Sequence, residues 1–137
     1  MKNSMFIDTS GFYALLAGQD NQHRNARDIL HGAARDKSQF ITTDYVLDET
    51  ATLLRARGLE HLIDPFFDIV FASRACCIVW MDEDRFLKTR SFFIKHSDHE
   101  WSFTDCASFI VMKELKLPLA LTKDKHYQEA GFTALLI

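Results

Sequence analysis

Met5-Phe6-Ile7-Asp8 is the stretch that decides the fold, because three apolar residues lead directly to a carboxylate. Such a short run suits a buried strand that ends at Asp8. Similar strand candidates recur at 40–43, 75–80 and 119–121, and longer stretches with helical spacing separate them. Strands that alternate with helices predict an α/β fold, in which a mostly parallel sheet carries helices on both faces. The right-handedness of such crossovers restricts the topology further.

The predicted elements cover most of the chain. Helices are expected over 12–16, 21–35, 45–57, 59–73, 82–95 and 102–115, and strands over 5–7, 40–43, 75–80, 119–121 and 133–137. Asp44 is the expected N-cap of the helix over 45–57. Pro65 is an obstacle within 59–73, since proline breaks a helix interior but is tolerated in the first turn of a new helix.

The composition is that of an ordinary globular chain. With 137 residues, 47% of them apolar, one domain over 1–137 is expected. We find no secretory leader and no run of membrane-spanning length, and therefore expect a soluble cytoplasmic protein without a membrane partner. The net charge of −3 argues against binding nucleic acid over the whole surface, although an enzyme could still meet phosphates through metal ions. Cys76, Cys77 and Cys106 form no CxxC pair and are expected to be buried thiols.

Several carboxylates follow the predicted strands. Asp8 ends the first strand, Asp124 comes just after strand 119–121, and Asp44, Asp48 and Glu49 follow strand 40–43 within two helical turns. Because the carboxyl ends of parallel strands meet at one edge of a sheet, we expect these acids to gather there.

Position on a helix helps to choose between neighbouring acids. The helix over 45–57 has an apolar face that includes Val46 and Leu54. Glu49 lies beside this face and Asp48 points further outward, so Glu49 is the better inward-facing candidate. The helix over 102–115 is apolar nearly all round and should be buried. Its first turn contains Asp105, which is hard to explain as a surface charge.

Helix capping is the simpler alternative for each acid taken alone. Asp8 and Asp44 could cap helices, and Ser102 to Asp105 resembles a capping box with Asp in place of Glu. For the whole set a shared metal site is favoured, because capping does not require acids at the ends of separate strands.

A cluster of carboxylates needs compensation. Two unit charges 4 Å apart repel by about 4 kcal/mol at an effective dielectric near 20. Few basic residues flank these acids, Lys123 and Lys125 being the exceptions. Hard oxygen ligands suit Mg²⁺ or Mn²⁺, which can activate water for the displacement at a phosphodiester. The set therefore predicts a hydrolytic metal site.

The order of these motifs resembles the PIN domain. The matching segments are Phe6 to Gly11, Glu49, Trp101 to Phe109, Thr122 to Tyr127 and Ala130 to Phe132, which span essentially the whole chain. The most specific are the Trp-Ser-Phe-Thr-Asp-Cys block that begins at Trp101 and the closing Asp-Lys-His-Tyr block that begins at Asp124.

This resemblance implies a three-layer α/β/α nuclease that cuts RNA with Mg²⁺ or Mn²⁺. By position, the metal-binding and catalytic acids would be Asp8, Glu49, Asp105 and Asp124. Ser10 and Thr104 match polar positions that support them, and Asp98 or Glu100 lies in an often acidic stretch that could add a carboxylate. Many small members are VapC-like toxins. The resemblance then implies a homodimeric endoribonuclease that cuts tRNA, rRNA or mRNA and is inhibited by a cognate antitoxin in a type II toxin–antitoxin pair.

The sequence also bears on several alternative functions. A receiver domain needs an acidic pair after the first strand, and a phosphatase needs Asp-x-Asp where Ser10 stands. A PIN-like module that binds RNA or a partner without cutting would be expected to lack an acid, and all four are present. A PIN nuclease of RNA processing, rather than a toxin, is a further alternative. His96 and His99 flank Asp98 and would permit a zinc site, although surface loop residues are the commoner explanation.

Overall fold

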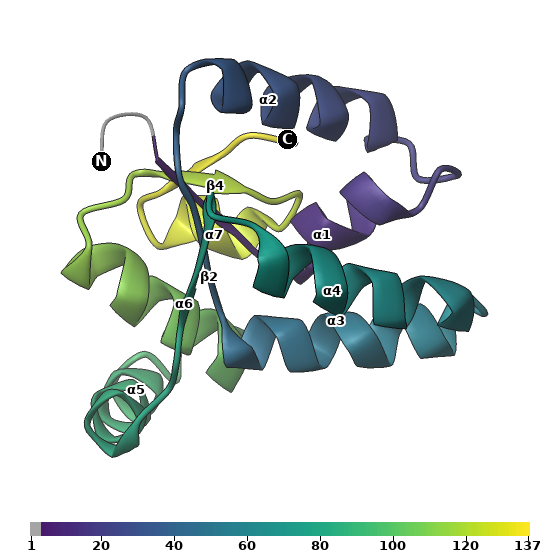
Figure 1. Ribbon diagram of the computed structural model, residues 1–137. Helices are drawn as coiled ribbons and strands as arrows, with labels where there is room; N and C mark the ends of the chain where they lie inside the picture. The colour runs from purple at the N-terminus through teal and green to yellow at the C-terminus, as the bar shows by residue number, and fades with distance from the viewer. Residues whose placement is uncertain (1–3) are drawn as a thin grey trace.

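A computed structural model describes residues 4–137 and shows an α/β fold built on one sheet (Figure 1). The strands are β1 (Met5–Ile7), β2 (Phe40–Thr43), β3 (Cys76–Val79), β4 (Leu119–Leu121) and β5 (Thr133–Ala134). They lie in the order β3-β2-β1-β4-β5, and every neighbouring pair is parallel. The predicted parallel sheet of about five strands is confirmed.

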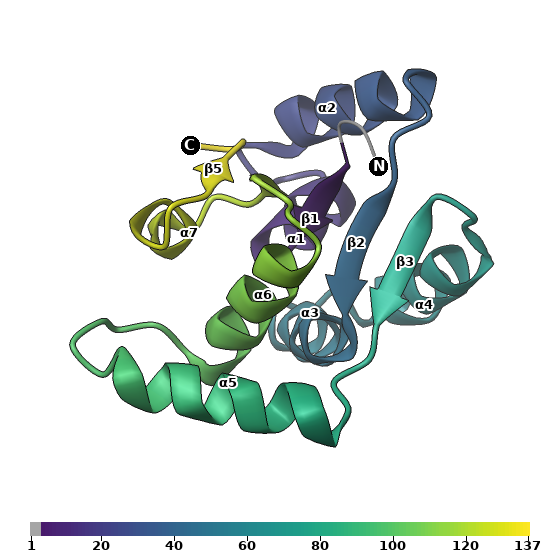
Figure 2. The same ribbon diagram turned by 90° about the vertical axis from the view of Figure 1, so that its left-hand side faces the viewer.

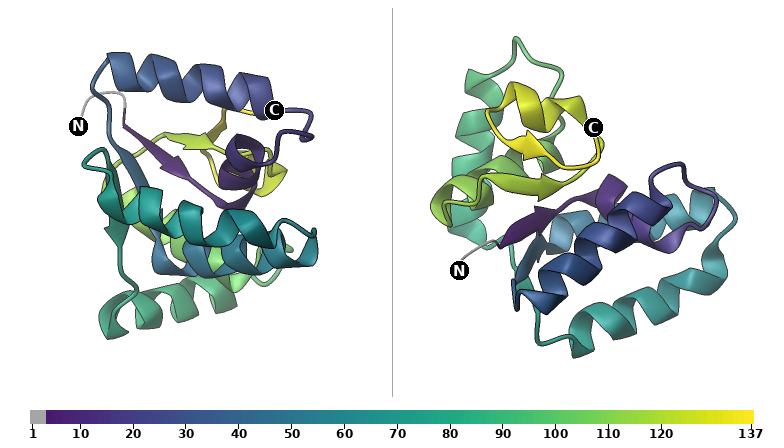
Figure 3. Two further views of the ribbon diagram at one scale, coloured as in Figure 1. Left: turned by 45° about the vertical axis from the view of Figure 1, so that its right-hand side comes forward. Right: turned by 90° about the horizontal axis from the view of Figure 1, so that it is seen from above.

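Helices cover both faces of the sheet. They are α1 (Thr9–Leu16), α2 (His23–Arg35), α3 (Asp44–Ala56), α4 (Ile63–Ala72), α5 (Glu83–Lys95), α6 (Phe103–Glu114) and α7 (Lys125–Glu129), with a 3-10 turn, η1 (Glu60–Leu62), before α4. The right-hand view of Figure 3 shows α1, α2 and α4 on one side of the strands and α5, α6 and α7 on the other. The strands β1, β2 and β3 run side by side in Figure 2, and α3 lies near the carboxyl end of β2. The expected three-layer architecture is confirmed.

Two helix starts differ from the sequence prediction because of capping. The first helix begins at Thr9 rather than at Phe12, since the Asp8 carboxylate accepts a hydrogen bond from the Gly11 N–H at 2.8 Å. The expected N-cap Asp44 is wrong. Thr43 caps α3 through its hydroxyl, and Asp44 accepts a hydrogen bond from the Met81 N–H at 2.9 Å. Asp44 thus ties α3 to the segment after β3 and points away from the other acids.

The stretch over 59–73 is divided by its proline. Pro65 stands in the first turn of α4, where its missing N–H breaks no helical hydrogen bond. The sequence prediction missed α7, because five residues are too few to show helical periodicity. It also made the last strand too long, since the strand ends at Ala134.

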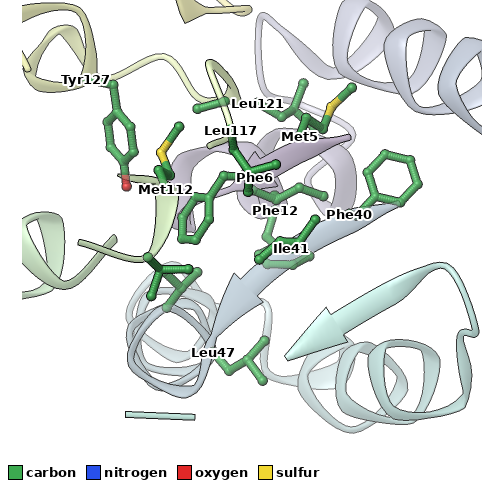
Figure 4. Packing of buried hydrophobic residues seen from close by; sticks show 14 of the residues in the cluster. Met5, Phe6, Phe12, Phe40, Ile41, Leu47, Met112, Leu117, Leu121 and Tyr127 are labelled. Atoms are coloured by element: carbon green, nitrogen blue, oxygen red, sulfur yellow. The ribbon is translucent and has the colours of Figure 1, made fainter. Parts of the chain in front are cut away.

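The core lies around β1 (Figure 4). Phe6 and Ile41 are fully buried on neighbouring strands, and Phe109 of α6 and Tyr127 of α7 cover them from one face. Gly11 brings α1 against β4, because a Cβ at this position would lie 2.0 Å from the Leu121 carbonyl oxygen. This close approach carries the N-terminus of α1, and with it Asp8, to the end of β4.

The prediction of three buried thiols is wrong for one of them. Cys106 is buried and Cys76 is half-buried, but Cys77 is exposed. Cys76 and Cys77 are successive residues of the edge strand β3, so their side chains point to opposite faces of the sheet, and only the Cys76 face is partly covered. Within residues 4–137, no helix combines the length and the apolar character needed to cross a membrane.

Candidate active site

Carboxylates from four separate parts of the chain line one pocket. Asp8 follows β1, Glu49 lies on α3, Asp105 is in the first turn of α6, and Asp124 follows β4. The pocket has a volume of about 190 Å³. It is completed by Thr9, Ser10, Val46, Leu53, Thr104 and Tyr127. The parallel sheet thus brings together three of the acids expected from its strand ends, Asp8, Glu49 and Asp124, and the buried helix α6 adds Asp105. Asp44 and Asp48, which were expected at the same edge, do not line the pocket.

Asp8 is the most deeply buried of these acids, with an exposed fraction of 6%. Its Oδ2 accepts a hydrogen bond from the Thr122 hydroxyl at 2.6 Å, and its Oδ1 accepts from the Ser10 hydroxyl at 2.9 Å. Burial raises the pKa of Asp8 to about 7, although these hydrogen bonds favour the ionised form. The carboxylate is therefore held in position by hydrogen bonds, and no side chain among residues 4–137 forms an ion pair with it.

Glu49 faces the pocket and Asp48 does not line it. Both acids of α3 are exposed in part, but only the Glu49 carboxylate lines the pocket that holds Asp8, Asp105 and Asp124. Burial raises the pKa of Glu49, and the nearby charge of Asp105 acts in the same direction. The hydroxyl of Thr9 lies 3.4 Å from Glu49 Oε1, and Thr104 also donates to this carboxylate. The helical phase that favours Glu49 over Asp48 agrees with this geometry.

Asp105 has two roles in the structure. Its carboxylate accepts a hydrogen bond from the Ser102 N–H at 3.2 Å and so closes the capping box of α6, as the simpler alternative expected. The same oxygen, Oδ2, lies 3.2 Å from Nδ1 of His126. Burial raises the pKa of Asp105, and the charge of Asp124 raises it further. Capping and membership of the acid pocket are thus compatible in one residue.

Asp124 caps α7 and brings a histidine to the acids. Its Oδ1 accepts a hydrogen bond from the His126 N–H at 2.9 Å and lies 3.4 Å from His126 Nδ1. The imidazole therefore stands between Asp105 and Asp124, and ligand atoms of these three residues lie within 4.8 Å of one another. His126 was not among the predicted site residues. The Asp-x-His spacing of the closing block was the signal that could have identified it.

The lysines beside Asp124 do not line the pocket. Lys123 Nζ lies 2.8 Å from Asp20 Oδ1, in the turn between α1 and α2, and Lys125 is exposed. Among residues 4–137, the side chains that line the acid pocket include no Lys or Arg. Within these residues, the repulsion between the carboxylates is therefore opposed by no lysine or arginine inside the pocket, and the His126 imidazole lies beside Asp105 and Asp124 alone.

The predicted supporting residues have different positions. Ser10 hydrogen-bonds to Asp8, and Thr104 lines the pocket beside Asp105. Asp98 does not join them, because it is exposed in the loop between α5 and α6, and it lies near His99. Glu100 is exposed in the same loop. Thr122 was overlooked as a supporting residue, although it connects two acids: its hydroxyl donates to Asp8 and accepts from the Asp124 N–H at 3.0 Å.

Comparison with known proteins places this geometry in a family. The model of the PIN domain matches residues 5–133. The chain belongs to the PIN-domain family. The match begins at β1 and ends in β5, so it includes every strand that carries or adjoins the acid pocket.

Curated PIN-domain relatives match most of the chain. The 23S rRNA-specific endonuclease VapC20 of Mycobacterium tuberculosis is 29% identical over 133 residues, which cover 93% of this chain and 95% of the relative. A VapC ribonuclease of Archaeoglobus fulgidus is 30% identical over 115 residues, covering 82% of this chain and 72% of the relative.

Solved structures agree with the fold. The crystal structure of M. tuberculosis VapC20, a sarcin-ricin loop cleaving toxin, superposes with a TM-score of 0.85 at 26% identity and covers 94% of this chain and 96% of that one. FitAcB from Neisseria gonorrhoeae gives a TM-score of 0.57 at 17% identity over 95% of this chain and 94% of that one, which is a likeness of fold.

The donor atoms of this PIN domain fit a hard divalent cation. The charges of neighbouring acids raise the pKa values of Asp8, Glu49 and Asp105 beyond the effect of burial, which shows that the carboxylates are close enough to repel. Carboxylate oxygens beside hydroxyl groups are ligands that Mg²⁺ and Mn²⁺ prefer. A cation among them would remove the repulsion and favour the ionised forms.

Proposed function

We propose that this PIN domain is a metal-dependent endoribonuclease. The observation that carries the proposal is the pocket in which Asp8, Glu49, Asp105 and Asp124 meet, and which no Lys or Arg among residues 4–137 lines. A buried carboxylate is costly to ionise unless a partner neutralises it. Mg²⁺ or Mn²⁺ would do so and would keep positions open for water and phosphate oxygens.

The four acids would hold the ion, and their neighbours would orient them. The ion would supply a water of lowered pKa and positive charge beside the scissile phosphate. The Thr122 and Ser10 hydroxyls fix the two oxygens of Asp8, and the Ser102 N–H fixes Asp105. Such outer hydrogen bonds keep ligand oxygens pointed at one place, so that little reorganisation is needed when the ion binds.

Structured ribosomal RNA is the first substrate class to test. The M. tuberculosis relative is a 23S rRNA-specific endonuclease, and its similarity extends over nearly the whole chain. We infer an RNA substrate of the same broad kind, with tRNA and mRNA as the comparison substrates.

The test is cleavage of rRNA, tRNA and mRNA transcripts by the wild type and by Asp8→Asn, in Mg²⁺, in Mn²⁺ and in EDTA. Asn keeps the size of the side chain and can still accept from Gly11, so the variant should fold. We expect RNA cleavage by the wild type in Mg²⁺ or Mn²⁺, and no cleavage by the wild type in EDTA or by Asp8→Asn in any condition. Equal cleavage in all arms would contradict the proposal, and RNA binding without cleavage would favour the non-catalytic module.

We propose further that the nuclease is the toxin of a type II toxin–antitoxin pair. The similar VapC20 of M. tuberculosis is a sarcin-ricin loop cleaving toxin, which supports this role. Expression of the wild type alone should slow growth, and expression of Asp8→Asn should not. Co-expression of a small protein encoded by the adjacent gene should restore growth. Harmless overexpression of an active enzyme would instead favour a role in RNA processing.

We also propose a homodimer. Large apolar side chains are exposed on and just before α5, and a second copy could cover them: Trp80, Phe86, Leu87, Phe93 and Ile94. Sedimentation velocity should give a dimer for the wild type and a monomer for Leu87→Glu. Leu115→Glu, which changes an exposed leucine at the end of α6, is the matched control and should stay dimeric. A monomeric wild type at all concentrations would contradict this proposal.

A further inference from the structure

The loop between α5 and α6 gathers a second set of metal-ligand side chains, outside the acid pocket. Ligand atoms of His96, Asp98 and His99 lie within 4.8 Å of one another. His99 Nε2 is 3.8 Å from Asp98 Oδ2. Two bonds of about 2.0–2.2 Å to one ion can join atoms up to about 4.2 Å apart. This pair is therefore already spaced for a shared ion, and a ring nitrogen of His96 lies within 4.8 Å of both ligand atoms.

Aromatic packing orders both imidazoles before any ion binds. The His99 ring stacks on the indole of Trp101, with ring centroids 3.9 Å apart and planes 9° apart. The centroid of the His96 ring lies 4.3 Å from that of Phe92 and 5.4 Å from that of Trp101. Trp101 is itself buried, with an exposed fraction of 7%. The histidines thus lose less side-chain freedom on binding an ion than free surface histidines would.

Glu129 of α7 lies beside the ring of His99. Its Oε1 accepts a hydrogen bond from the Trp101 indole N–H at 3.0 Å, and His99 Nδ1 lies 3.9 Å from the same oxygen. A carboxylate on the Nδ1 side favours a proton on that nitrogen and leaves Nε2, which is 3.8 Å from Asp98 Oδ2, to bind an ion. Metal-ligating histidines commonly have such a carboxylate behind the other ring nitrogen.

We propose that His96, Asp98 and His99 form a binding site for a borderline divalent transition metal of the Zn²⁺ class. Two imidazole nitrogens and one carboxylate oxygen suit Zn²⁺, and a water would take the fourth position. Mg²⁺ requires mainly oxygen ligands and would not bind this set. The site is separate from the acid pocket and does not depend on the proposed ribonuclease activity.

The bound ion would clamp the loop that leads into α6. His99 connects through Trp101 and Glu129 to α7, and Ser102, the next residue after Trp101, begins the capping box of α6. An ion between His96 and His99 would therefore fix the end of α5 against the start of α6, which carries Asp105, and against the end of α7, whose N-cap is Asp124. This is a structural role, whose expected effect is on stability.

The test isolates this loop from other ligands. The background variant carries Asp105→Asn, Asp124→Asn and Cys77→Ser, which weaken the acid pocket and remove the exposed thiol. Titration with ZnCl₂ by calorimetry should show one ion per chain with micromolar or tighter affinity. His96→Gln/His99→Gln in this background should lower the affinity by about 100-fold or more, and Glu129→Gln by about 10-fold.

The matched control is His31→Gln/His61→Gln, which removes the same number of imidazoles from exposed positions elsewhere. It should bind Zn²⁺ as the background does. Saturating ZnCl₂ should raise Tm by about 5 °C or more in the background and the control, and not in His96→Gln/His99→Gln. The proposal is wrong if the background binds no Zn²⁺, or if both pairs of substitutions weaken binding equally.

Discussion

Glu49 and Asp48 are adjacent acids that should differ sharply in their effect on cleavage. Both side chains are exposed in part, but Glu49 lines the acid pocket and Asp48 does not. Loss of an outer hydrogen-bond partner of a metal ligand costs about 10- to 100-fold in activity, so loss of a ligand should cost more. We expect Glu49→Gln to lower kcat/KM by at least about 100-fold. Asp48→Asn should stay within a few-fold of the wild type, measured on the same RNA. A larger loss of kcat/KM in Asp48→Asn than in Glu49→Gln would contradict the placement of Glu49 in the active site.

Thr122 should matter although it carries no charge. Its hydroxyl is buried, donates to Asp8 and accepts from the Asp124 N–H, so it holds two acids at once. Thr122→Val should lower cleavage and the affinity for Mn²⁺ by about 10- to 100-fold. Thr42→Val is the control, because Thr42 is equally buried and donates to the Ile7 carbonyl outside the pocket. If Thr122→Val and Thr42→Val both lose stability and both lower cleavage by the same small factor, Thr122 does not position the acids.

At the scale of elements, the N-terminus of α6 joins helix stability to the site. The Ser102 hydroxyl accepts a hydrogen bond from the Asp105 N–H at 3.0 Å, and the Asp105 carboxylate accepts one from the Ser102 N–H. Ser102→Ala should lower the free energy of unfolding by about 1 kcal/mol. It should also lower cleavage, because the turn that presents Asp105 is loosened.

Asp82→Ala at the N-cap of α5 provides the matched comparison. Asp82 accepts a hydrogen bond from the Arg85 N–H at 2.9 Å, and neither residue lines the acid pocket. It should cost a similar amount of stability in urea unfolding while leaving kcat/KM almost unchanged. An equal loss of activity in both variants would mean that stability alone explains the effect of Ser102.

Periodicity and position predicted the elements that are long or buried, and they failed where local contacts decide. The strand over 5–7 and the phase of Glu49 followed from apolar spacing alone. The helix α7 did not, because its five residues depend on the Asp124 cap and on the burial of Tyr127. Thr43 is the N-cap of α3 in place of the predicted Asp44 for a similar reason. Only the folded chain brings the Met81 N–H to the Asp44 carboxylate.

The acid site was predictable as a set and not in its details. Strand ends of a parallel sheet converge whatever the sequence, so Asp8 and Asp124 could be placed together in advance. The position of His126 between two acids depends on the turn of α7, which apolar spacing does not reveal. The exclusion of Asp98 likewise depends on the path of the loop after α5.

For the whole molecule, the acid pocket is a source of instability as well as of function. Burial raises the pKa of Asp8 to about 7 in the folded protein, from 3.8 for a free Asp side chain. Between these values the folded state binds a proton that the unfolded state lacks. The contribution of Asp8 to stability therefore falls as pH rises from about 4 to 7 and is constant above that. Glu49 and Asp105, whose pKa values are also raised, act in the same direction.

The pH dependence of stability due to Asp8 is therefore opposite to that of an acid in an ion pair. In EDTA at pH 7.5, Asp8→Asn should be more stable than the wild type by up to about 4 kcal/mol in urea unfolding. The difference should shrink toward zero near pH 4, where the Asp8 carboxyl is protonated in the folded wild type. Saturating Mn²⁺ at pH 7.5 should stabilise the wild type and have little effect on the variant, because the ion replaces the proton as the partner of Asp8. A variant that is less stable than the wild type at pH 7.5 without metal would show that Asp8 is stabilised by its hydrogen bonds alone, and the need for a cation in this pocket would lose its main physical support.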